Sequence, residues 1–443
     1  MSKSNAGCAI KNFLENKSVL IMGFGREGKS TYNYIRKYMP DKQLTVCDKN
    51  TFSGETLEIL ESDANCEIVC GENYMDIVNA FDVVMKSPGI SVRDIEISEG
   101  TYMTCQLDLF MKFAPCVKVG ITGTKGKTTT STLIHCILKS AGKNTCLIGN
   151  IGVPVLDMID DCENRIAVIE MSSHQLEFTR TSPHIAVLTN IYEEHLDHYK
   201  GFEGYYGAKL NIVRNQTGDD YFIHNKEQNL SDFISTDIIC SKQIAIGMDD
   251  SDSNPFFASL TDINPHLPGR HNAQDAFFAA TVAKILGLSE EEIRCGLKTF
   301  EGIPHRLEYV GNFSGIDFYN DCIATVPTAV MYGVEALKRV DTLIIGGMDR
   351  GLDYTGFEKD LSASDIENII CLPETGHTIG DAIADTGKNV IKVSDMKEAV
   401  DAAFSNTKPG RICLISPAAS SYNYYKNFEE KGNHYKELVR NHI

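Results

Sequence analysis

Short apolar runs alternate with stretches of helical character from one end of the chain to the other. Runs of the length expected for buried strands occupy residues 17–22, 44–47, 81–85, 116–121, 165–170, 185–190, 342–345 and 412–415. Between these strands, the segment that ends at Tyr38 and the apolar run 133–138 are each predicted to be helical. Strands that alternate with helices predict an α/β protein with largely parallel sheets.

At 443 residues the chain is longer than one hydrophobic core usually serves. We expect three domains, over residues 1–106, 107–304 and 305–443. Residues 87–89, Ser-Pro-Gly, form a turn after the last predicted strand of the first domain. Residues 302–304, Gly-Ile-Pro, resemble a linker before the third.

A glycine-rich turn lies between the predicted strand 116–121 and the following helix. It reads Thr-Gly-Thr-Lys-Gly-Lys-Thr-Thr over residues 122–129. Glycines let successive backbone N–H groups point inward, and the helix N-terminus adds positive potential. This context predicts a phosphate-binding P-loop in which Lys127 reaches the terminal phosphates and Thr128 holds Mg²⁺. Only two residues separate Gly123 from Gly126, whereas the common P-loop has four.

A second glycine motif, G-x-G-x-x-G over residues 23–28, follows the first predicted strand. Asp48 ends the next strand, 20 positions after Gly28, which is the spacing of a Rossmann-type nucleotide site. We therefore expect the N-terminal domain to be Rossmann-like and to bind a nucleotide with a ribose and a pyrophosphate. The motif alone also fits an NAD-dependent oxidoreductase, but that class does not explain the P-loop lysine.

Three further side chains are candidates for metal chemistry. Glu170 ends a buried-type strand, where P-loop enzymes place an acid that holds Mg²⁺; it could instead cap the next helix. His195 lies in a dense run of acids and histidines after the strand 185–190, which suggests a metal-assisted site, although such a run can be only a solvated face. Lys209 alone would be interpreted as a surface lysine.

Composition excludes several classes of protein. The net charge of −18 and an isoelectric point near 5.1 argue against a nucleic-acid partner. No apolar run is long enough for a membrane span, and the N-terminus lacks an apolar signal core. The 14 cysteines are scattered without a C-x-x-C pair, so we expect reduced thiols and no zinc site. These features predict a cytoplasmic protein, which we expect to be a monomer acting on small molecules.

Taken together, the motifs resemble the Mur ligase family, and the resemblance covers essentially the whole chain. It rests on TGTKGKTTT at 122–130, GNIG at 149–152, EMSSHQLE at 170–177, TNIYEEHLDHY at 189–199, AKL at 208–210, GRHN at 269–272 and GIPHR at 302–306. Within the family, SPGI at 87–90, SPAASS at 416–421 and YKNFE at 425–429 are similar to the branch that adds D-glutamate to UDP-N-acetylmuramoyl-L-alanine. The Rossmann-like N-terminal domain is also typical of that branch.

The resemblance implies ATP-driven amide formation in peptidoglycan precursor synthesis. The alanyl carboxylate would take the γ-phosphate of ATP to give an acyl phosphate and ADP, and the glutamate amine would then displace phosphate. Phosphorylation makes a carboxylate oxygen a competent leaving group, while metal ions and fixed cations neutralise the developing charge. The family architecture also implies a Rossmann-like C-terminal domain that binds the amino acid.

The resemblance also assigns roles to individual residues. Lys127, Glu170, His195 and Lys209 would be catalytic; Thr128 and Glu170 would hold one Mg²⁺, and His195 a second, with Lys209 after carbamylation by CO₂. ATP would contact Gly123, Thr124, Lys125, Gly126, Lys127, Thr128, Thr129, Asn272, Arg306 and Asp321. UDP-sugar contacts would come from Gly25, Arg26, Asp48, Lys49, Gly89 and Asn150, with Ser172 and Gln175 nearer the muramoyl end. The incoming glutamate would contact Arg350, Ser421 and Phe428.

Four positions, at three places in the chain, depart from the family pattern. Cys322 and Ile323 stand where serine and lysine are commonest, which removes a cation near the phosphates or the amino acid. Asp275 replaces an asparagine expected to pair with adenine, and a carboxylate only accepts hydrogen bonds. Arg350 stands where a lysine usually contacts glutamate, and its fork changes the geometry. These changes leave open the same ligation with L-glutamate, or a non-catalytic nucleotide-binding relative.

Overall fold

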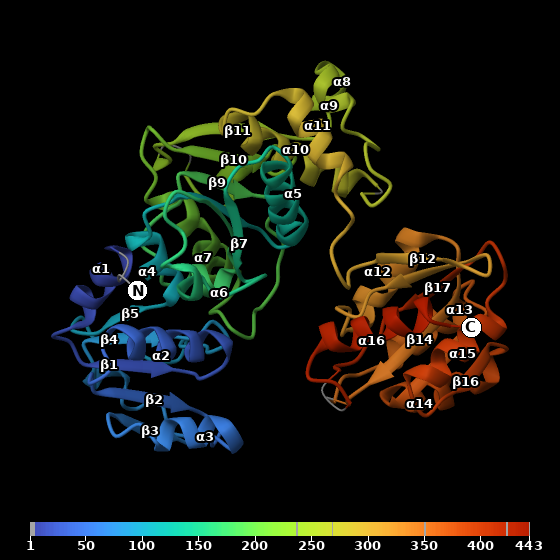
Figure 1. Ribbon diagram of the computed structural model, residues 1–443, viewed down its shortest axis with the longest axis horizontal. Coiled ribbons are helices and arrows are strands. Elements are labelled where there is room, and N and C mark those ends of the chain that lie inside the picture. Colours follow the sequence, from blue (N-terminus) through green and yellow to red (C-terminus); the bar gives the residue numbers. More distant parts are fainter. Residues whose placement is uncertain (1–4, 236–237, 268, 350, 422–423, 443) are drawn as a thin grey trace. The chain divides into compact units, whose positions relative to one another are not determined.

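The computed structural model describes residues 5–235, 238–267, 269–349, 351–421 and 424–442. Its strands form three sheets, each built largely of parallel strands with helical crossovers (Figure 1). The predicted α/β class with parallel sheets is therefore confirmed. The chain divides into two compact units: residues 1–263 with 270–299, and residues 264–269 with 300–443.

The first sheet has the strand order β3-β2-β1-β4-β5, and all its pairings are parallel. The predicted strands at 17–22 and 44–47 and the helix to Tyr38 are confirmed. Its elements, with the helices around it, are α1 (Asn5–Leu14), β1 (Val19–Met22), α2 (Arg26–Tyr38), β2 (Leu44–Asp48), α3 (Gly54–Glu61), β3 (Cys66–Cys70), η1 (Val78–Ala80), β4 (Val83–Lys86) and β5 (Tyr102–Thr104). Gly28 permits the close approach of α2 to β1, because a Cβ there would lie 2.0 Å from the Gly23 carbonyl oxygen.

The second sheet, also parallel, has the order β11-β10-β9-β6-β8-β7. Helix α5 packs against β7 and β8, and α10 packs against α5 (Figure 1). The elements are α4 (Gln106–Phe113), β6 (Val117–Thr122), α5 (Lys127–Ser140), β7 (Thr145–Gly149), η2 (Val155–Met158), β8 (Ile166–Glu170), α6 (Ser173–Leu176), β9 (Ile185–Leu188), α7 (Phe202–Arg214), β10 (Tyr221–Asn225), η3 (Leu230–Asp232), β11 (Lys242–Ile246), α8 (Asp250–Ser253), α9 (Pro255–Ala258), α10 (Arg270–Ile285) and α11 (Glu290–Lys298).

The first two sheets belong to one compact unit because helices between them share a core. Leu107 and Phe110 of α4, Ile35 of α2 and Val155 of η2 are all buried in that one cluster. Polar contacts reinforce it: Ser30 donates to Asp157 Oδ1 at 2.6 Å. Burial of this apolar surface stabilises the joint between the sheets at about 25 cal/mol per Å².

The third sheet has the order β12-β13-β17-β14-β15-β16, in which only the β12–β13 pair is antiparallel. The strand predicted at 412–415 is confirmed, and the one at 342–345 extends to 340–347. Its elements are β12 (Glu308–Phe313), β13 (Ile316–Asn320), α12 (Pro327–Leu337), β14 (Val340–Gly347), α13 (Thr355–Ala363), β15 (Asn368–Glu374), α14 (Thr375–Ala382), η5 (Ala384–Thr386), β16 (Asn389–Lys392), α15 (Met396–Asn406), β17 (Ile412–Ile415) and α16 (Phe428–Arg440). None of the described helices is both long and apolar enough to cross a membrane.

Candidate active site

Three loops meet at the carboxyl edge of the central sheet. Strand β6 lies between β8 and β9, with Ile121 opposite Glu170 and Thr122 opposite Leu188. The P-loop after β6, Glu170 at the end of β8 and the segment after β9 therefore share one edge. In open parallel sheets, this edge is where ligands bind.

The P-loop has the backbone geometry that its glycines predict. Gly126 adopts φ 83° immediately before α5, and Gly123 adopts φ 151°. A Cβ on Gly123 would lie 1.9 Å from Thr189 Oγ1, so the turn has no room for a side chain there. Lys127 Nζ donates to the carbonyl oxygens of Gly123 and Thr124, both at 2.9 Å, which folds the lysine back over the loop.

Residues just after β9 hold this loop in place. Asn190 accepts from Thr124 N through its carbonyl oxygen and from Lys125 N through Oδ1, both at 2.8 Å. Thr189 Oγ1 donates to the Lys125 carbonyl oxygen at 2.6 Å. The segment predicted to carry metal chemistry therefore also builds the phosphate loop.

Glu170 is a buried carboxylate with one oxygen left over. Its side chain is 1% exposed, and Oε1 accepts from Asn150 Nδ2 at 2.7 Å. Oε2 is buried and has no hydrogen-bond partner among the described residues. A buried anionic oxygen without a donor is costly unless a cation completes it. This donor set fits Mg²⁺.

The described residues contain no group of three histidine, cysteine or carboxylate side chains that could hold a metal by themselves. Mg²⁺ usually binds through one or two carboxylates together with substrate phosphates and water. The predicted set of Thr128, Glu170, His195 and Lys209 agrees with that mode, since it supplies few protein ligands beside a phosphate loop.

Lys209 of α7 is not a surface residue, because only 1% of it is exposed. Its Nζ donates to the Gly123 carbonyl oxygen at 2.8 Å and lies 4.6 Å from the centre of the Tyr205 ring. Burial holds the pKa of Lys209 well below its usual range, and the positive charge of Lys127 is the second cause of this shift. The structure thus brings Lys209 and Lys127 to the same carbonyl and favours a neutral amine at Lys209.

His195 follows β9 with the backbone in the left-handed region, at φ 57°. Its ring lies 4.7 Å from that of His174, which in turn lies 4.1 Å from the ring of His198. Burial, opposed by Glu194, lowers the pKa of His195. A neutral imidazole is the form that binds a metal ion.

Four of the predicted UDP-sugar residues lie together in the first unit. Arg26 Nη2 donates to the Asn150 carbonyl oxygen at 3.1 Å, and Gln175 Nε2 donates to Glu27 Oε1 at 2.6 Å. Ser172 and Gln175 form a capping box at the start of α6. Asn150 connects this group to Glu170, because its backbone accepts from Arg26 and its side chain donates to Glu170.

The other predicted residues of the N-terminal site lie around the glycine turn. Asp48 Oδ2 accepts from Phe24 N at 3.1 Å, which closes the turn onto the end of β2. Gly25 is the N-cap of α2 and is exposed, as are Lys49 and Gly89. These three positions have surface available for a ligand.

In the second unit, Asp321 is 4% exposed and accepts from Leu307 N at 3.2 Å and from Ser416 Oγ at 2.8 Å. Burial raises the pKa of Asp321 to about 6. Arg306 lies in this unit, whereas Asn272 lies on α10 of the first, so the predicted ATP residues come from both compact units.

The predicted glutamate residues in the second unit are Ser421, Phe428 and Arg350. Ser421 Oγ is buried and has no hydrogen-bond partner within the described chain. Phe428 begins α16, whose N-cap is Asn427. Arg350 lies outside the described residues.

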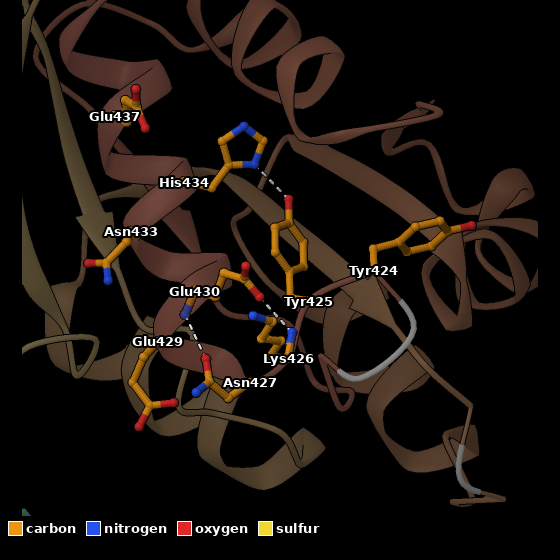
Figure 2. Close-up of a pocket in the computed structure, with 9 residues that line it drawn as sticks. All are labelled: Tyr424, Tyr425, Lys426, Asn427, Glu429, Glu430, Asn433, His434 and Glu437. Atoms are coloured by element: carbon orange, nitrogen blue, oxygen red, sulfur yellow. Dashed lines mark hydrogen bonds between the residues drawn. The ribbon is translucent and has the colours of Figure 1, made fainter. Parts of the chain in front are cut away.

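A hollow of about 670 Å³ lies beside the start of α16. Figure 2 shows its lining: Tyr424, Tyr425, Lys426, Asn427, Glu429, Glu430, Asn433, His434 and Glu437. Within it, the Tyr425 hydroxyl lies 2.9 Å from His434 Nδ1. Its three glutamates repel an anionic amino acid, and neither Ser421 nor Phe428, the predicted glutamate-binding residues that the structure describes, lines it.

Of the departures from the family pattern that the structure describes, Asp275 and Cys322 are buried and Ile323 is half-buried. Asp275 on α10 accepts from Thr130 Oγ1 at 3.1 Å and packs so closely under the P-loop that a Cβ on Gly126 would lie 2.6 Å from its Oδ1. Cys322 is fully buried, and burial raises the pKa of its thiol to about 12. The altered adenine contact at Asp275 remains a prediction.

Several charged residues near these sites are absent from the sequence predictions. Lys86 at the end of β4 pairs with Glu177 Oε2 at 3.2 Å, and its side chain is 1% exposed. In the second unit, Lys431 is 2% exposed and donates to the Gly346 carbonyl oxygen at 2.7 Å. In the sequence, Lys86 directly follows the apolar residues 83–85. This position was the available signal that the lysine is buried and paired with an acid.

Comparison with known proteins decides the family. Residues 17–107 match the family described as Mur ligase MurD-like, N-terminal domain; residues 121–283 match Mur ligase middle domain, and residues 305–419 match Mur ligase, glutamate ligase domain. The UDP-N-acetylmuramoylalanine--D-glutamate ligase of Acetivibrio thermocellus is 32% identical over 97% of both chains. The chain belongs to the Mur ligase family.

Other comparisons agree with this Mur ligase assignment. The enzyme of the same name from Ligilactobacillus salivarius is 33% identical over 96% of both chains. Among solved structures, the UDP-N-acetylmuramate-alanine ligase MurC of Thermotoga maritima aligns with a TM-score of 0.56 and 17% identity, over 96% of this chain and 99% of that one. This likeness supports the three-domain Mur ligase fold.

Proposed function

We propose that the protein is an ATP-dependent ligase that joins D-glutamate to UDP-N-acetylmuramoyl-L-alanine, with release of ADP and phosphate, in the cytoplasm. One observation carries this proposal: a P-loop lysine, a buried carboxylate with an oxygen that lacks a partner among the described residues, and a buried lysine meet at one sheet edge. The similarity to relatives named for this reaction gives the substrates.

The reaction needs a carboxylate made reactive towards an amine. Residues 123–129 would surround the β- and γ-phosphates of ATP with backbone N–H groups at the start of α5. Lys127 would turn from the carbonyl oxygens of Gly123 and Thr124 towards the γ-phosphate. It would stay with this phosphoryl group during transfer to the alanyl carboxylate. The acyl phosphate that forms is then attacked by the glutamate amine, and phosphate leaves.

We propose two Mg²⁺ sites at this edge. Thr128 and Glu170 would hold the first, and His195 with a carbamylated Lys209 would hold the second. Bound Mg²⁺ would neutralise charge that develops on the transferred phosphoryl group. The chain's own contribution is to keep both sites beside the P-loop through Asn150 and Asn190, which fix Glu170 and the loop respectively.

The surroundings of Lys209 support its carbamylation. A neutral amine adds to CO₂ and loses a proton to give a carbamate anion, and the low pKa of Lys209 provides that neutral amine. The change replaces repulsion from Lys127 by attraction. It also converts a group that only donates into an oxygen ligand.

Each domain would then supply one part of the site. Residues 1–106 would bind the UDP-sugar through Gly25, Arg26, Asp48, Lys49 and Gly89, aided by Asn150, Ser172 and Gln175 of the central domain. Residues 107–304 would bind ATP. Residues 305–443 would supply Arg306 and Asp321 for ATP, and Arg350, Ser421 and Phe428 for glutamate.

Phosphate release tests this function directly. Purified protein with ATP, Mg²⁺ and UDP-N-acetylmuramoyl-L-alanine should release phosphate only when D-glutamate is added. Release with L-glutamate alone would replace the proposal by the L-glutamate ligation. No release with either enantiomer would support a non-catalytic nucleotide-binding protein, the reading that Ile323 and Asp275 motivate.

Lys209→Ala tests the carbamate separately. The variant should lose most activity and recover part of it when a small carboxylate such as acetate is added, because the carboxylate can occupy the vacated volume as an anionic ligand. Full activity of the variant without acetate would contradict a role for Lys209.

A further inference from the structure

The segment that carries His195 has no regular secondary structure between β9 and α7. Within it, residues 195–199, which we call the His195 turn, are closed by bonds from the amides of His198 and Tyr199 to the His195 carbonyl oxygen, at 3.0 and 3.3 Å. The left-handed backbone of His195 costs about 1 kcal/mol for a residue with a Cβ. Such a conformation persists only where its surroundings impose it.

The contacts that surround it come from the segment that follows β4. Ser91 Oγ donates to the His198 carbonyl oxygen at 2.6 Å. Arg93 Nη1 donates to the carbonyl oxygen of Asp197 and lies 3.5 Å from that of Leu196. Three successive carbonyl groups of the His195 turn are therefore taken by two side chains of a segment about a hundred residues earlier in the chain.

A buried ion pair fastens the side chains of the same region. Lys86 Nζ lies 3.2 Å from Glu177 Oε2, and the same oxygen lies 3.3 Å from His198 Nε2. The His198 ring packs edge-on against His174, which packs against His195. Lys86 Nζ also lies 3.5 Å from the carbonyl oxygens of Ser87 and Pro88, in the turn proposed to meet the UDP-sugar.

We propose that residues 86–93, the clamp segment, hold the His195 turn in its metal-binding conformation, so that Lys86, Ser91 and Arg93 are positioning residues for His195. The proposal rests on the proposed function, because that function makes His195 a ligand. None of the three residues needs to touch a substrate for this role. Groups that orient a metal ligand typically change metal affinity or activity by roughly 10- to 100-fold when removed.

Arg93→Ala in the full-length protein tests the clamp, because Arg93 is partly exposed and its loss leaves the core intact. Arg93→Lys is the conservative variant, since a lysine can still donate to one carbonyl group. Arg339→Ala is the matched control: that arginine is also exposed and donates to a backbone carbonyl oxygen, of Gly410 in the other compact unit. Ser91→Ala provides a second, milder change in the clamp segment.

Two measurements distinguish positioning from a general structural role. Hydrogen exchange of a peptide covering residues 195–199, without ligands, should quicken about tenfold in Arg93→Ala, partly recover in Arg93→Lys and stay unchanged in Arg339→Ala. The Mg²⁺ concentration for half-maximal phosphate release should rise about tenfold in Arg93→Ala, while the KM for ATP stays within about twofold. Ser91→Ala should show the same pattern to a smaller extent.

Unchanged exchange in the His195 turn together with an unchanged Mg²⁺ requirement would overturn the clamp. Faster exchange over the whole first unit would also overturn it, because a local clamp changes local protection alone. An inactive wild-type protein would count against the ligase function, whereas the exchange experiment would still decide whether residues 86–93 hold the turn.

Discussion

Glu170 and Glu177 receive the same substitution with opposite expected effects on stability. Glu170→Gln keeps the acceptor for Asn150 and removes a buried charge whose Oε2 has no hydrogen-bond partner in the described chain. A buried polar atom without a hydrogen-bond partner costs about 1–3 kcal/mol, and a charged one costs more, so removal of the charge is stabilising; the N–H groups of the new amide, which also lack a partner there, cancel part of this gain. We expect the ligand-free variant to be more stable than wild type by about 1 kcal/mol.

Glu177→Gln removes a carboxylate that is already paired. Burial would raise the pKa of Glu177, but the hydrogen bond from His198 and the charge of Lys86 bring it below its ordinary value. The substitution leaves Lys86 buried without its counter-charge. Breaking a buried pair costs about 3–5 kcal/mol, which partial exposure of Glu177 reduces to about 2–3 kcal/mol.

Nucleotide should reverse the order of wild type and Glu170→Gln. Ligand at 100 times its Kd stabilises wild type by about 2.7 kcal/mol. If losing the Mg²⁺ ligand weakens binding about 100-fold, the variant gains only about 0.4 kcal/mol, so wild type leads by roughly 1.3 kcal/mol. Phosphate release should fall at least about 100-fold in the variant.

Hydrogen exchange of peptides covering β6 and β8 measures these free energies for the first unit alone, with and without Mg²⁺ and a non-hydrolysable ATP analogue. If Glu170→Gln is less stable than ligand-free wild type by about 1 kcal/mol or more, the cost assigned to the oxygen of Glu170 that lacks a partner is refuted. Equal stabilisation of both proteins by nucleotide would refute its role in Mg²⁺ binding.

Three further predictions concern other positions. Because burial raises the pKa of Asp321 to about 6, the cost of its buried charge to folding is absent below about pH 4 and grows as pH rises through 6. Asp321→Asn should abolish this pH dependence of stability, which hydrogen exchange in the second unit measures between about pH 4.5 and 7.5. A pH dependence that persists in the variant would belong to another group. Gly123→Ala should abolish the ATP binding that calorimetry detects, because its Cβ would meet Thr189. Gly142→Ala is the control: it is also at positive φ but in open space, and should cost only about 1 kcal/mol of stability. Equal effects of the two substitutions would contradict the steric argument. Lys431→Met should raise the KM for glutamate more than that for ATP, because Lys431 holds the glycine turn before residue 350; an equal rise in both would count against this local role.

Much of the fold could be predicted because its signals are local. The apolar runs at 19–22, 185–188 and 412–415 are buried on both faces, so their hydrophobicity is continuous along the chain. Strand β11, by contrast, is largely exposed, and β3 is only partly buried, so neither has the continuous pattern that marks a buried parallel strand. The merging of the first two sheets into one compact unit depends on helix faces that pack across a long sequence separation.

The candidate site divides in the same way. The P-loop and the acid at the end of β8 were predictable, because a glycine turn between strand and helix, and a carboxylate after a buried strand, are patterns of adjacent residues. The family resemblance added the roles of His195 and Lys209. Charged partners such as Lys86 and Glu177 lie some ninety positions apart, and nothing in either local sequence pairs them.

The sequence by itself determined the parallel α/β architecture, the phosphate loop and the family, since each follows from short patterns whose physical meaning is local. Only the tertiary structure decided the chemical state of the key groups. Burial makes Lys209 a low-pKa amine and, within the part of the chain that the structure describes, leaves one oxygen of Glu170 without a partner. Contacts from the segment after β4 fix the turn that carries His195. Desolvation and long-range contact depend on what surrounds a side chain, and that is set by the packing of distant segments.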